Sequence, residues 1–327
     1  MSTRTVCVTR RPPGDWEERL RSAGFVVRVP DAPQHEPLAR RAFLDGIAGC
    51  DAVIGMITDR WDAEAFDRAG PQLRIIANYG VGYNNIDVEE ANRRGVAVTN
   101  TPDVLTDATA DVAWGLLLAA ARRFGEGERR LRAGEFNGWG PSDYLGVDLA
   151  GQTLGIIGPG RIGTAIARRS RGWDMRVVYT HRKSKPAFEQ ATAAQRLPLD
   201  ELLATADFVS LSCPLMPETR HLIGARELSL MKPTAVLVNT ARGPVVDEAA
   251  LVEALRERRI FAAGLDVYER EPELAPGLAG LDNAVLLPHV GSATFRTRET
   301  MARIVVDNVL AVFDGKRPPT LVNEPAG

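Results

Sequence analysis

Cysteine is scarce in this sequence of 327 residues, which contains only Cys7, Cys50 and Cys213. An odd number of cysteines without a CxxC spacing argues against a disulfide framework and against a zinc site. We therefore expect three reduced thiols and no bound metal.

Long hydrophobic runs and an excess of charge are also missing. No apolar run reaches the length of a membrane-spanning helix, and no targeting segment precedes the first short apolar stretch, residues 6–8. The 40 Lys and Arg residues against 42 Asp and Glu residues leave a net charge of -2, which creates no basic field to gather nucleic acid or acidic lipid. These absences predict a cytoplasmic protein that binds neither nucleic acid nor membrane.

Short apolar runs alternate with amphipathic segments along the chain, a rhythm typical of βαβ units and parallel sheets. A first series of strands is expected at residues 6–8, 25–29, 52–54, 73–77 and 96–98. A second series is expected at residues 155–158, 176–179, 208–211, 235–239, 261–266 and 284–287. Between the two series lie an Ala- and Leu-rich helix over residues 106–123 and a loop-like stretch over residues 134–149, and a last helix is expected over residues 294–313.

The pattern GxGxxG occurs where the second series begins, with glycines at 158, 160 and 163. A buried strand precedes it and a helix-like segment follows, which is the context of a dinucleotide-binding turn. Gly158 would permit the tight turn, Gly160 would let the backbone approach a pyrophosphate, and Gly163 would let the helix pack against the strand. The alternative interpretation is a structural glycine turn without a ligand.

An acidic residue is missing from the end of the next strand, where NAD-dependent enzymes hold the ribose hydroxyls with Asp or Glu. Thr180 stands there instead, followed by Arg182 and Lys183. An arginine can pair with a 2′-phosphate that a carboxylate would repel. We therefore predict NADP(H) as the preferred cofactor, with NAD(H) possible and a merely solvated basic loop as the alternative.

Three later strands are each followed by a side chain that can take part in proton transfer or substrate binding. Arg242 follows the strand over 235–239, a glutamate, Glu269 or Glu271, follows the strand over 261–266, and His289 follows the strand over 284–287. Ligands of open α/β sheets bind at the carboxyl ends of the strands, so these three side chains are expected at one edge. A histidine suits proton transfer and an arginine suits a carboxylate.

Six segments together resemble the D-isomer-specific 2-hydroxyacid dehydrogenases: residues 78–82, 153–163, 213–219, 239–243, 264–272 and 288–293. The resemblance covers nearly the whole chain and implies an α/β protein with two doubly wound parallel-sheet domains. A flavodoxin-like substrate domain would comprise residues 1–102 and 294–327, and an inserted Rossmann NAD(P)-binding domain would comprise residues 103–293. Members of the family are usually homodimers.

The resemblance also implies roles for individual residues. His289 is expected to be the general acid, Glu271 to bond its other ring nitrogen and fix the tautomer, and Arg242 to hold the substrate carboxylate and polarise the carbonyl. Glu269 is the near competitor of Glu271. His35, His181 and His221 are expected to be ordinary packed or surface histidines.

The remaining predicted site residues are expected to contact the substrate or the cofactor. For the substrate these are Met56, Val81, Gly82, Arg242 and His289. For the cofactor they are Thr106, Gly158, Gly160, Arg161, Ile162, Gly163, Thr180, Arg182, Lys183, Cys213, Pro214, Thr219, Thr240, Ala241, Arg242, Asp266, His289 and Gly291. Met56 has the alternative of core filler, the 80–82 segment that of a plain turn, and Asp266 that of a local turn cap.

Within the family, a preference for NADPH is most typical of glyoxylate and hydroxypyruvate reductases, which reduce small 2-keto acids. Trp139 resembles a tryptophan that in some of these reductases reaches the active site of the partner subunit, with dimer packing as the alternative. Two other interpretations stay open. One is a D-lactate-type or other dehydrogenase on the same scaffold, and the other is a dinucleotide-sensing interaction protein like the C-terminal binding corepressors.

Overall fold

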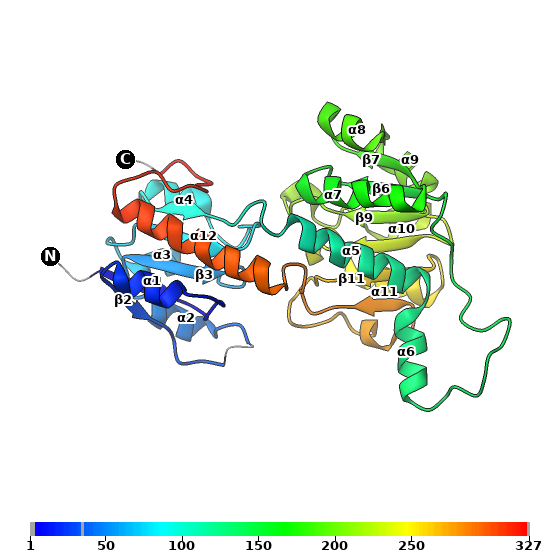
Figure 1. Cartoon of the computed structure of the whole chain (residues 1–327), viewed down its shortest axis with the longest axis horizontal. Coiled ribbons are helices and arrows are strands. Elements are labelled where there is room, and N and C mark those ends of the chain that lie inside the picture. Colours follow the sequence, from blue (N-terminus) through cyan, green and yellow to red (C-terminus); the bar gives the residue numbers. More distant parts are fainter. Residues whose placement is uncertain (1–3, 34–35, 326–327) are drawn as a thin grey trace. The chain divides into compact units, whose positions relative to one another are not determined.

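The computed structural model describes residues 4–33 and 36–325. The chain forms two compact units, Met1–Leu105 with Ser292–Gly327, and Thr106–Gly291 (Figure 1). The sequence prediction divided the chain after residues 102 and 293, and the roles assigned to the two domains stay a prediction. His35 lies outside the described residues.

The first unit contains a five-stranded sheet in the order β2-β1-β3-β4-β5, and every pairing is parallel. Its strands are β1 (Arg4–Val8), β2 (Phe25–Arg28), β3 (Ala52–Met56), β4 (Ile75–Tyr79) and β5 (Ala97–Thr99). Its helices are α1 (Trp16–Ser22), α2 (Arg40–Ile47), α3 (Ala63–Ala69), α4 (Val88–Arg93) and α12 (Phe295–Phe313). This strand order is that of flavodoxin-like folds.

Side chains alternate between the two faces of the sheet along each strand, so this unit has a hydrophobic cluster on each face. Val53 of β3 packs in a cluster with Phe43 of α2 and Phe66 of α3, whereas its neighbour Ile54 packs with Val305 of α12. The C-terminal helix α12 lies against β4 and α1, so it belongs to the first unit. Its N-cap is Thr294, whose hydroxyl accepts a hydrogen bond from the Thr297 amide at 3.1 Å.

The second unit contains a seven-stranded parallel sheet in the order β12-β11-β10-β9-β6-β7-β8. Its strands are β6 (Thr153–Ile157), β7 (Arg176–Thr180), β8 (Gln195–Arg196), β9 (Phe208–Leu211), β10 (Val236–Asn239), β11 (Ala262–Leu265) and β12 (Ala284–Leu286). Its helices are α5 (Thr106–Ala121), α6 (Phe124–Arg132), α7 (Arg161–Arg169), α8 (Pro186–Thr192), α9 (Leu199–Thr205), α10 (Ala225–Leu230) and α11 (Glu248–Arg256). Counted from β6, the order reads 3-2-1-4-5-6 with one strand added, which is the Rossmann order.

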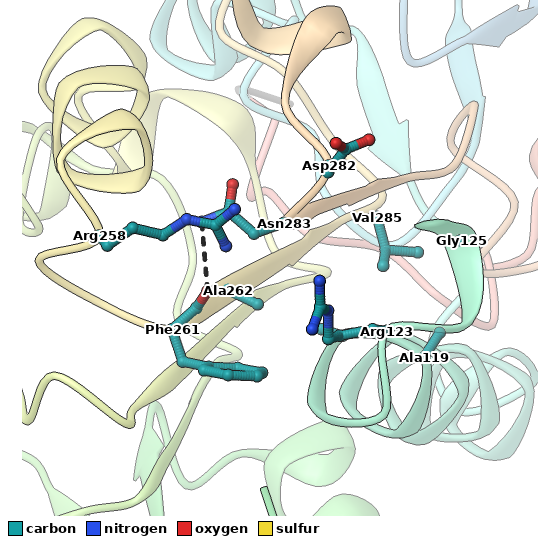
Figure 2. Close-up of a pocket in the computed structure, with 10 residues that line it drawn as sticks. Ala119, Arg123, Gly125, Arg258, Phe261, Ala262, Asp282, Asn283 and Val285 are labelled. Atoms are coloured by element: carbon teal, nitrogen blue, oxygen red, sulfur yellow. Dashed lines mark hydrogen bonds between the residues drawn. The ribbon is translucent and has the colours of Figure 1, made fainter. Parts of the chain in front are cut away.

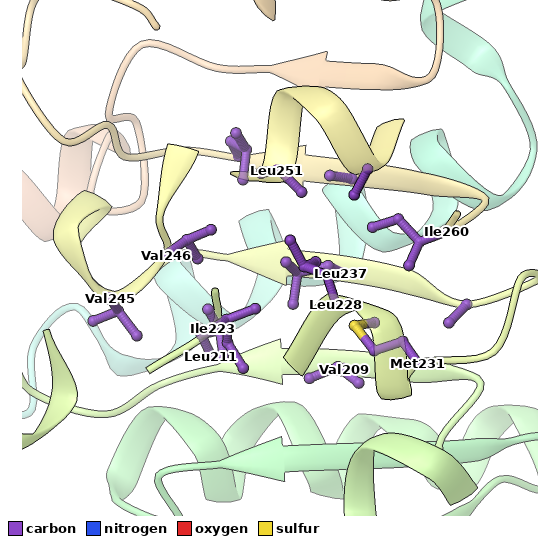
Figure 3. Packing of buried hydrophobic residues seen from close by; sticks show 14 of the residues in the cluster. Val209, Leu211, Ile223, Leu228, Met231, Leu237, Val245, Val246, Leu251 and Ile260 are labelled. Atoms are coloured by element: carbon purple, nitrogen blue, oxygen red, sulfur yellow. The ribbon is translucent and has the colours of Figure 1, made fainter. Parts of the chain in front are cut away.

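Both faces of this sheet are covered by helices, as the continuous apolar strands require. Val236 and Val238 of β10 pack in a cluster with residues of α5 and α7. Leu237, between them, packs on the other face in a cluster that also contains Leu228 of α10 and Leu251 of α11 (Figure 3). The predicted fold class is therefore confirmed.

Several element boundaries differ from the prediction by a few residues, and one strand was not predicted. The helix expected to reach residue 123 ends at Ala121, because Arg123 adopts a left-handed φ of 54° before α6 begins. Strand β4 begins at Ile75 and not at residue 73, since the amide of Leu73 closes a turn on the carbonyl of Gly70. The two-residue strand β8 was not predicted, because both its residues are exposed and form no apolar run.

Among the described helices, none has the length and apolar character to cross a bilayer.

Candidate active site

The glycine turn after β6 requires glycine at two of its three positions. Gly158 has a φ of 98°, and a Cβ there would come within 2.5 Å of the Cys213 amide nitrogen. A Cβ on Gly163 would collide with the carbonyl oxygen of Gly158, so its absence lets α7 start close to β6. A Cβ on Gly160 would meet nothing within 4 Å, which leaves the turn open to a ligand. The three glycines thus match the three requirements of a pyrophosphate-binding turn.

The surroundings of the turn also fit a dinucleotide. Arg161, which is exposed, and half-buried Ile162 begin α7, whose N-terminal amides and dipole favour an anion. The hydroxyls of Ser212 and Thr240 follow β9 and β10, are buried, and have no hydrogen-bond partner among the described residues. Buried hydroxyls without partners are rare in proteins and indicate a place for a polar ligand.

The loop after β9 abuts the glycine turn and is held by its own side chains. Thr219 donates its hydroxyl proton to the Pro214 carbonyl at 2.7 Å and accepts from the Met216 amide at 2.8 Å. Burial raises the pKa of the Cys213 thiol to about 11, so this thiol stays neutral beside the turn. Thr219 therefore shapes the loop that presents Cys213 and Pro214.

At the end of β7, the predicted cofactor-selecting residues are accessible. Thr180 is half-buried and lies opposite Ile157 in the register of β6 and β7, while Arg182 and Lys183 follow on the exposed loop. Both basic side chains are therefore open to an anionic ligand. The nearby carboxylate of Glu189 accepts hydrogen bonds from Tyr179 and Ser184.

His289 and Glu271 form a pair at the same carboxyl edge of the sheet, beyond β11 and β12 and away from the end of β7. The His289 Nδ1 and Glu271 Oε2 atoms lie 2.8 Å apart, and the second carboxylate oxygen accepts from the Tyr268 amide at 3.0 Å. Burial opposes ionisation of Glu271, but the hydrogen bond and charge of His289 outweigh it and hold the pKa of this carboxyl below its ordinary value. The pair thus engages the Nδ1 atom of His289 and not its Nε2 atom.

The competing glutamate has another partner. Glu269 Oε1 lies 2.7 Å from His221 Nε2, and Glu269 Oε2 accepts from the Glu248 amide at 3.4 Å. The structure thus pairs Glu271 with His289 and Glu269 with His221. Both glutamates lie in the irregular turn that follows β11, and this turn places their carboxylates against different histidines.

Asp266 holds the backbone that follows His289. Its two carboxylate oxygens accept from the amides of Val290 and Gly291 at 2.7 and 2.8 Å, and its side chain is buried, which raises the pKa of this carboxyl. These amides lie 24 and 25 residues further along the chain, so Asp266 caps a distant turn and not a local one. The turn contains His289 in a left-handed conformation with a φ of 53°. The contact of Asp266 with a cofactor stays a prediction.

Sequence reasoning missed Thr109, whose hydroxyl donates to the Gly291 carbonyl at 3.2 Å. Thr109 is buried on α5, one turn after the half-buried Thr106 that was predicted to contact the cofactor. A buried hydroxyl on an apolar helix face was the available signal.

Arg242 begins the turn after β10, beside buried Ala241. Burial lowers the pKa of the half-buried Arg242 guanidinium, and the negative charge of Glu271 counteracts this. The Asn239 side chain accepts from the Ala241 amide and donates to the Arg242 carbonyl, both at 3.0 Å. Since β10, β11 and β12 are adjacent and parallel, Arg242, Glu271 and His289 come to one edge, as the strand ends predicted.

The predicted substrate residues Met56, Val81 and Gly82 belong to the first unit. Met56 is the half-buried last residue of β3, and Val81 and Gly82 are half-buried after β4. All three stand at the carboxyl ends of their strands, the edge where ligands of flavodoxin-like sheets bind.

A pocket of the second unit lies away from these residues (Figure 2). Phe261 and Asn283 line it where β11 and β12 begin, together with Arg123 and Arg258. It is therefore at the amino edge of the sheet, opposite His289, and no predicted site residue lines it.

We expect Glu271→Gln to lower the melting temperature at neutral pH and to lose this effect in acid. A carboxyl whose pKa is lower in the folded state than its ordinary value of 4.5 stabilises the fold above that value, and the contribution disappears as pH falls through the folded pKa. Melting temperatures of both proteins measured between about pH 7 and pH 3 check this. A difference that is constant over this range would contradict the assignment.

A Rossmann sheet that carries a dinucleotide turn and an Arg, Glu and His constellation at its carboxyl edge defines a dinucleotide-dependent oxidoreductase. Residues 114–291 match the family described as D-isomer specific 2-hydroxyacid dehydrogenase, NAD binding domain, and this chain belongs to that family. This confirms the resemblance seen in the sequence.

The relatives include a glyoxylate reductase from Thermococcus onnurineus, 52% identical over 97% of this chain and 95% of the relative. The solved structure of the TT0316 protein from Thermus thermophilus is 48% identical with a TM-score of 0.90, covering 97% of this chain and 99% of that one. An NADPH-dependent glyoxylate/hydroxypyruvate reductase from Sinorhizobium meliloti, solved with NADP and malonate, is 34% identical with a TM-score of 0.85 and full coverage of both chains at 100%.

Proposed function

We propose that this protein reduces a small 2-keto acid, glyoxylate or hydroxypyruvate, to the D-2-hydroxy acid with NADPH. The observation that carries the proposal is the 2.8 Å contact between His289 and Glu271 at the same sheet edge as the glycine turn. The names of relatives at about half sequence identity support the choice of substrate.

The residues divide the chemistry between them. The nicotinamide, when bound, supplies a hydride to the carbonyl carbon. His289 donates the Nε2 proton to the carbonyl oxygen, so that the C=O double bond becomes a CH–OH group. Glu271 accepts from Nδ1 and stabilises the imidazolium before transfer, and Arg242 pairs with the carboxylate and polarises the carbonyl.

The preference for NADP(H) over NAD(H) is part of the proposal. Thr180 offers a hydroxyl at the position where NAD-dependent enzymes place a carboxylate against the ribose. The exposed Arg182 and Lys183 offer positive charge to a 2′-phosphate. The neighbouring Glu189 carboxylate is engaged by two hydroxyls, Tyr179 and Ser184.

Turnover measurements test the reductase. Absorbance of the reduced nicotinamide is followed with glyoxylate, hydroxypyruvate, pyruvate and phenylpyruvate, each with NADPH and with NADH. Fastest consumption with NADPH and the two small substrates is the expected result. Tight dinucleotide binding without consumption would instead favour a dinucleotide-sensing interaction protein, and preference for pyruvate would favour a D-lactate-type enzyme.

The homodimer is proposed from exposed apolar side chains on α6 and the loop that follows it. Leu131, Phe136, Trp139 and Leu145 are 60%, 60%, 83% and 62% exposed. Such a concentration of apolar surface marks an interaction site. The loop over residues 134–149 contains no helix or strand, in agreement with the prediction.

We expect Phe136→Ser combined with Trp139→Ser to weaken a dimer about tenfold or more in dissociation constant, because truncated aromatic anchors remove buried apolar area. Sedimentation over a concentration series should show wild type at about twice the 35.5 kDa chain mass. Phe295→Ser, which changes a side chain 90% exposed in the first unit, is the matched control and should not affect assembly. A monomeric wild type would contradict the proposal.

A further inference from the structure

In the segment Gly80, Val81 and Gly82, every carbonyl oxygen is turned toward the protein. The Gly80 carbonyl accepts from the Thr101 amide at 3.0 Å and from Asn78 Nδ2 at 3.3 Å. The same Asn78 amide group donates to the Gly82 carbonyl at 3.0 Å, and Asn100 Nδ2 donates to the Val81 carbonyl at 2.8 Å. Two asparagine side chains thus hold this loop from beneath.

The amides of the loop point the other way. The Gly80 amide closes a tight turn on the Asn78 carbonyl at 2.9 Å, whereas the amides of Val81 and Gly82 donate to no acceptor within residues 4–33 and 36–325. Both residues are half-buried. Two successive amides without acceptors among the described residues offer a pair of donors to an anion.

The loop has little freedom to adopt another shape. A Cβ on Gly80 would collide with the Ile57 side chain, so the close approach of the two loops requires glycine there. Asn78 is buried within β4 at 1% exposure, and both protons of its amide group are used by the loop. Removing them would leave the Gly82 carbonyl without this donor and the Gly80 carbonyl with the Thr101 amide alone.

The same network reaches the loop after β3. Asn85 Nδ2 donates to Asn78 Oδ1 at 3.4 Å, to the Met56 carbonyl at 3.3 Å and to the Asp59 carbonyl at 3.0 Å. Met56, the other predicted substrate residue of this unit, is therefore tied to the loop through two asparagines.

We propose that Asn78 and Asn100 are positioning residues that aim the Val81 and Gly82 amides at the carboxylate of the substrate. This inference rests on the proposed function, which supplies a 2-keto acid as the ligand. Neither asparagine needs to touch the substrate. Each accounts for the orientation of a peptide group whose N–H would donate to a carboxylate oxygen.

Asn78→Asp and Asn100→Asp test the inference with nearly unchanged side-chain volume. Each replaces an amide donor by a carboxylate oxygen, which cannot donate to the loop carbonyls and adds negative charge beneath the anion site. Asn323→Asp is the matched control, since Asn323 is also buried in the first unit and donates to the Val96 carbonyl at 2.9 Å. Melting curves establish which variants are folded.

The readout is the ratio of kcat/KM for glyoxylate to kcat/KM for its neutral methyl ester, with NADPH. Wild type and Asn323→Asp should prefer the acid, and both loop variants should lose about 10- to 100-fold of that preference through KM for the acid, with KM for NADPH unchanged. A general loss of structure would lower kcat/KM for the acid and for the ester equally. An unchanged ratio in the folded loop variants would overturn the inference.

A failure of the proposed function can be told apart from a failure of this inference by the turnover of the wild type. If wild type turns over neither substrate, the reductase proposal fails, and binding of oxamate with NADPH present then tests the loop alone. About tenfold weaker oxamate binding by Asn78→Asp or Asn100→Asp than by wild type would support the carboxylate site, and equal binding would overturn it.

Discussion

Replacing His289 by alanine is expected to lower kcat by about 10²- to 10⁴-fold while leaving the dissociation constant for NADPH nearly unchanged. In the proposed mechanism the His289 imidazole donates a proton to the carbonyl oxygen, and Glu271 lies 2.8 Å from its other ring nitrogen. The glycine turn that would hold the cofactor is formed by β6 and α7 and does not depend on it. Steady-state rates and fluorescence titration with NADPH measure the two quantities.

His221→Ala is the matched control, because His221 forms a similar pair with Glu269 at 2.7 Å. Its kcat should stay near that of wild type. Arg242→Ala should also reduce turnover severely, chiefly by losing the bidentate hold on the substrate carboxylate. Rates near that of wild type in both His289→Ala and Arg242→Ala would refute the catalytic assignment.

The second large effect is expected at the end of β7. Thr180→Asp combined with Arg182→Ala should shift the ratio of kcat/KM for NADPH to kcat/KM for NADH by about 10²- to 10³-fold toward NADH. In the proposed NADP(H) site, the change would remove a charge-assisted hydrogen bond to the 2′-phosphate, add a repulsive carboxylate, and give the ribose hydroxyls of NADH an acceptor.

Arg176→Ala is the control, because it also removes a positive charge but does so away from the proposed phosphate site. Arg176 is also exposed, but it is the first residue of β7, whereas Thr180 is the last. The control should keep the cofactor ratio of wild type. A double variant whose ratio also stays unchanged would mean that the phosphate is held elsewhere, and Lys183 would be tested next.

Much of the site could be predicted because parallel strands bring their carboxyl ends to one edge. Residues just after β10, β11 and β12 therefore had to lie near one another, and Arg242 and His289 followed from strand positions alone. The choice between Glu269 and Glu271 did not follow from the strands. It depends on how an irregular segment runs, and hydrophobic periodicity carries no information about such a segment.

The division between sequence and tertiary structure is clearest for the hydrogen-bonded side chains. Apolar periodicity and glycine spacing determined the sheets and the dinucleotide turn, because burial and backbone sterics act on neighbouring residues. The family was indicated by the resemblance of six segments of the sequence. The turn held by Asp266, and the loop held by Asn78 and Asn100, were decided only by tertiary structure. Asn100 meets Val81 from another strand end, and Asp266 meets Gly291 across 25 residues. Such partners are selected by the packed sheet, since a polar side chain in the sequence shows that it needs a partner without showing which one.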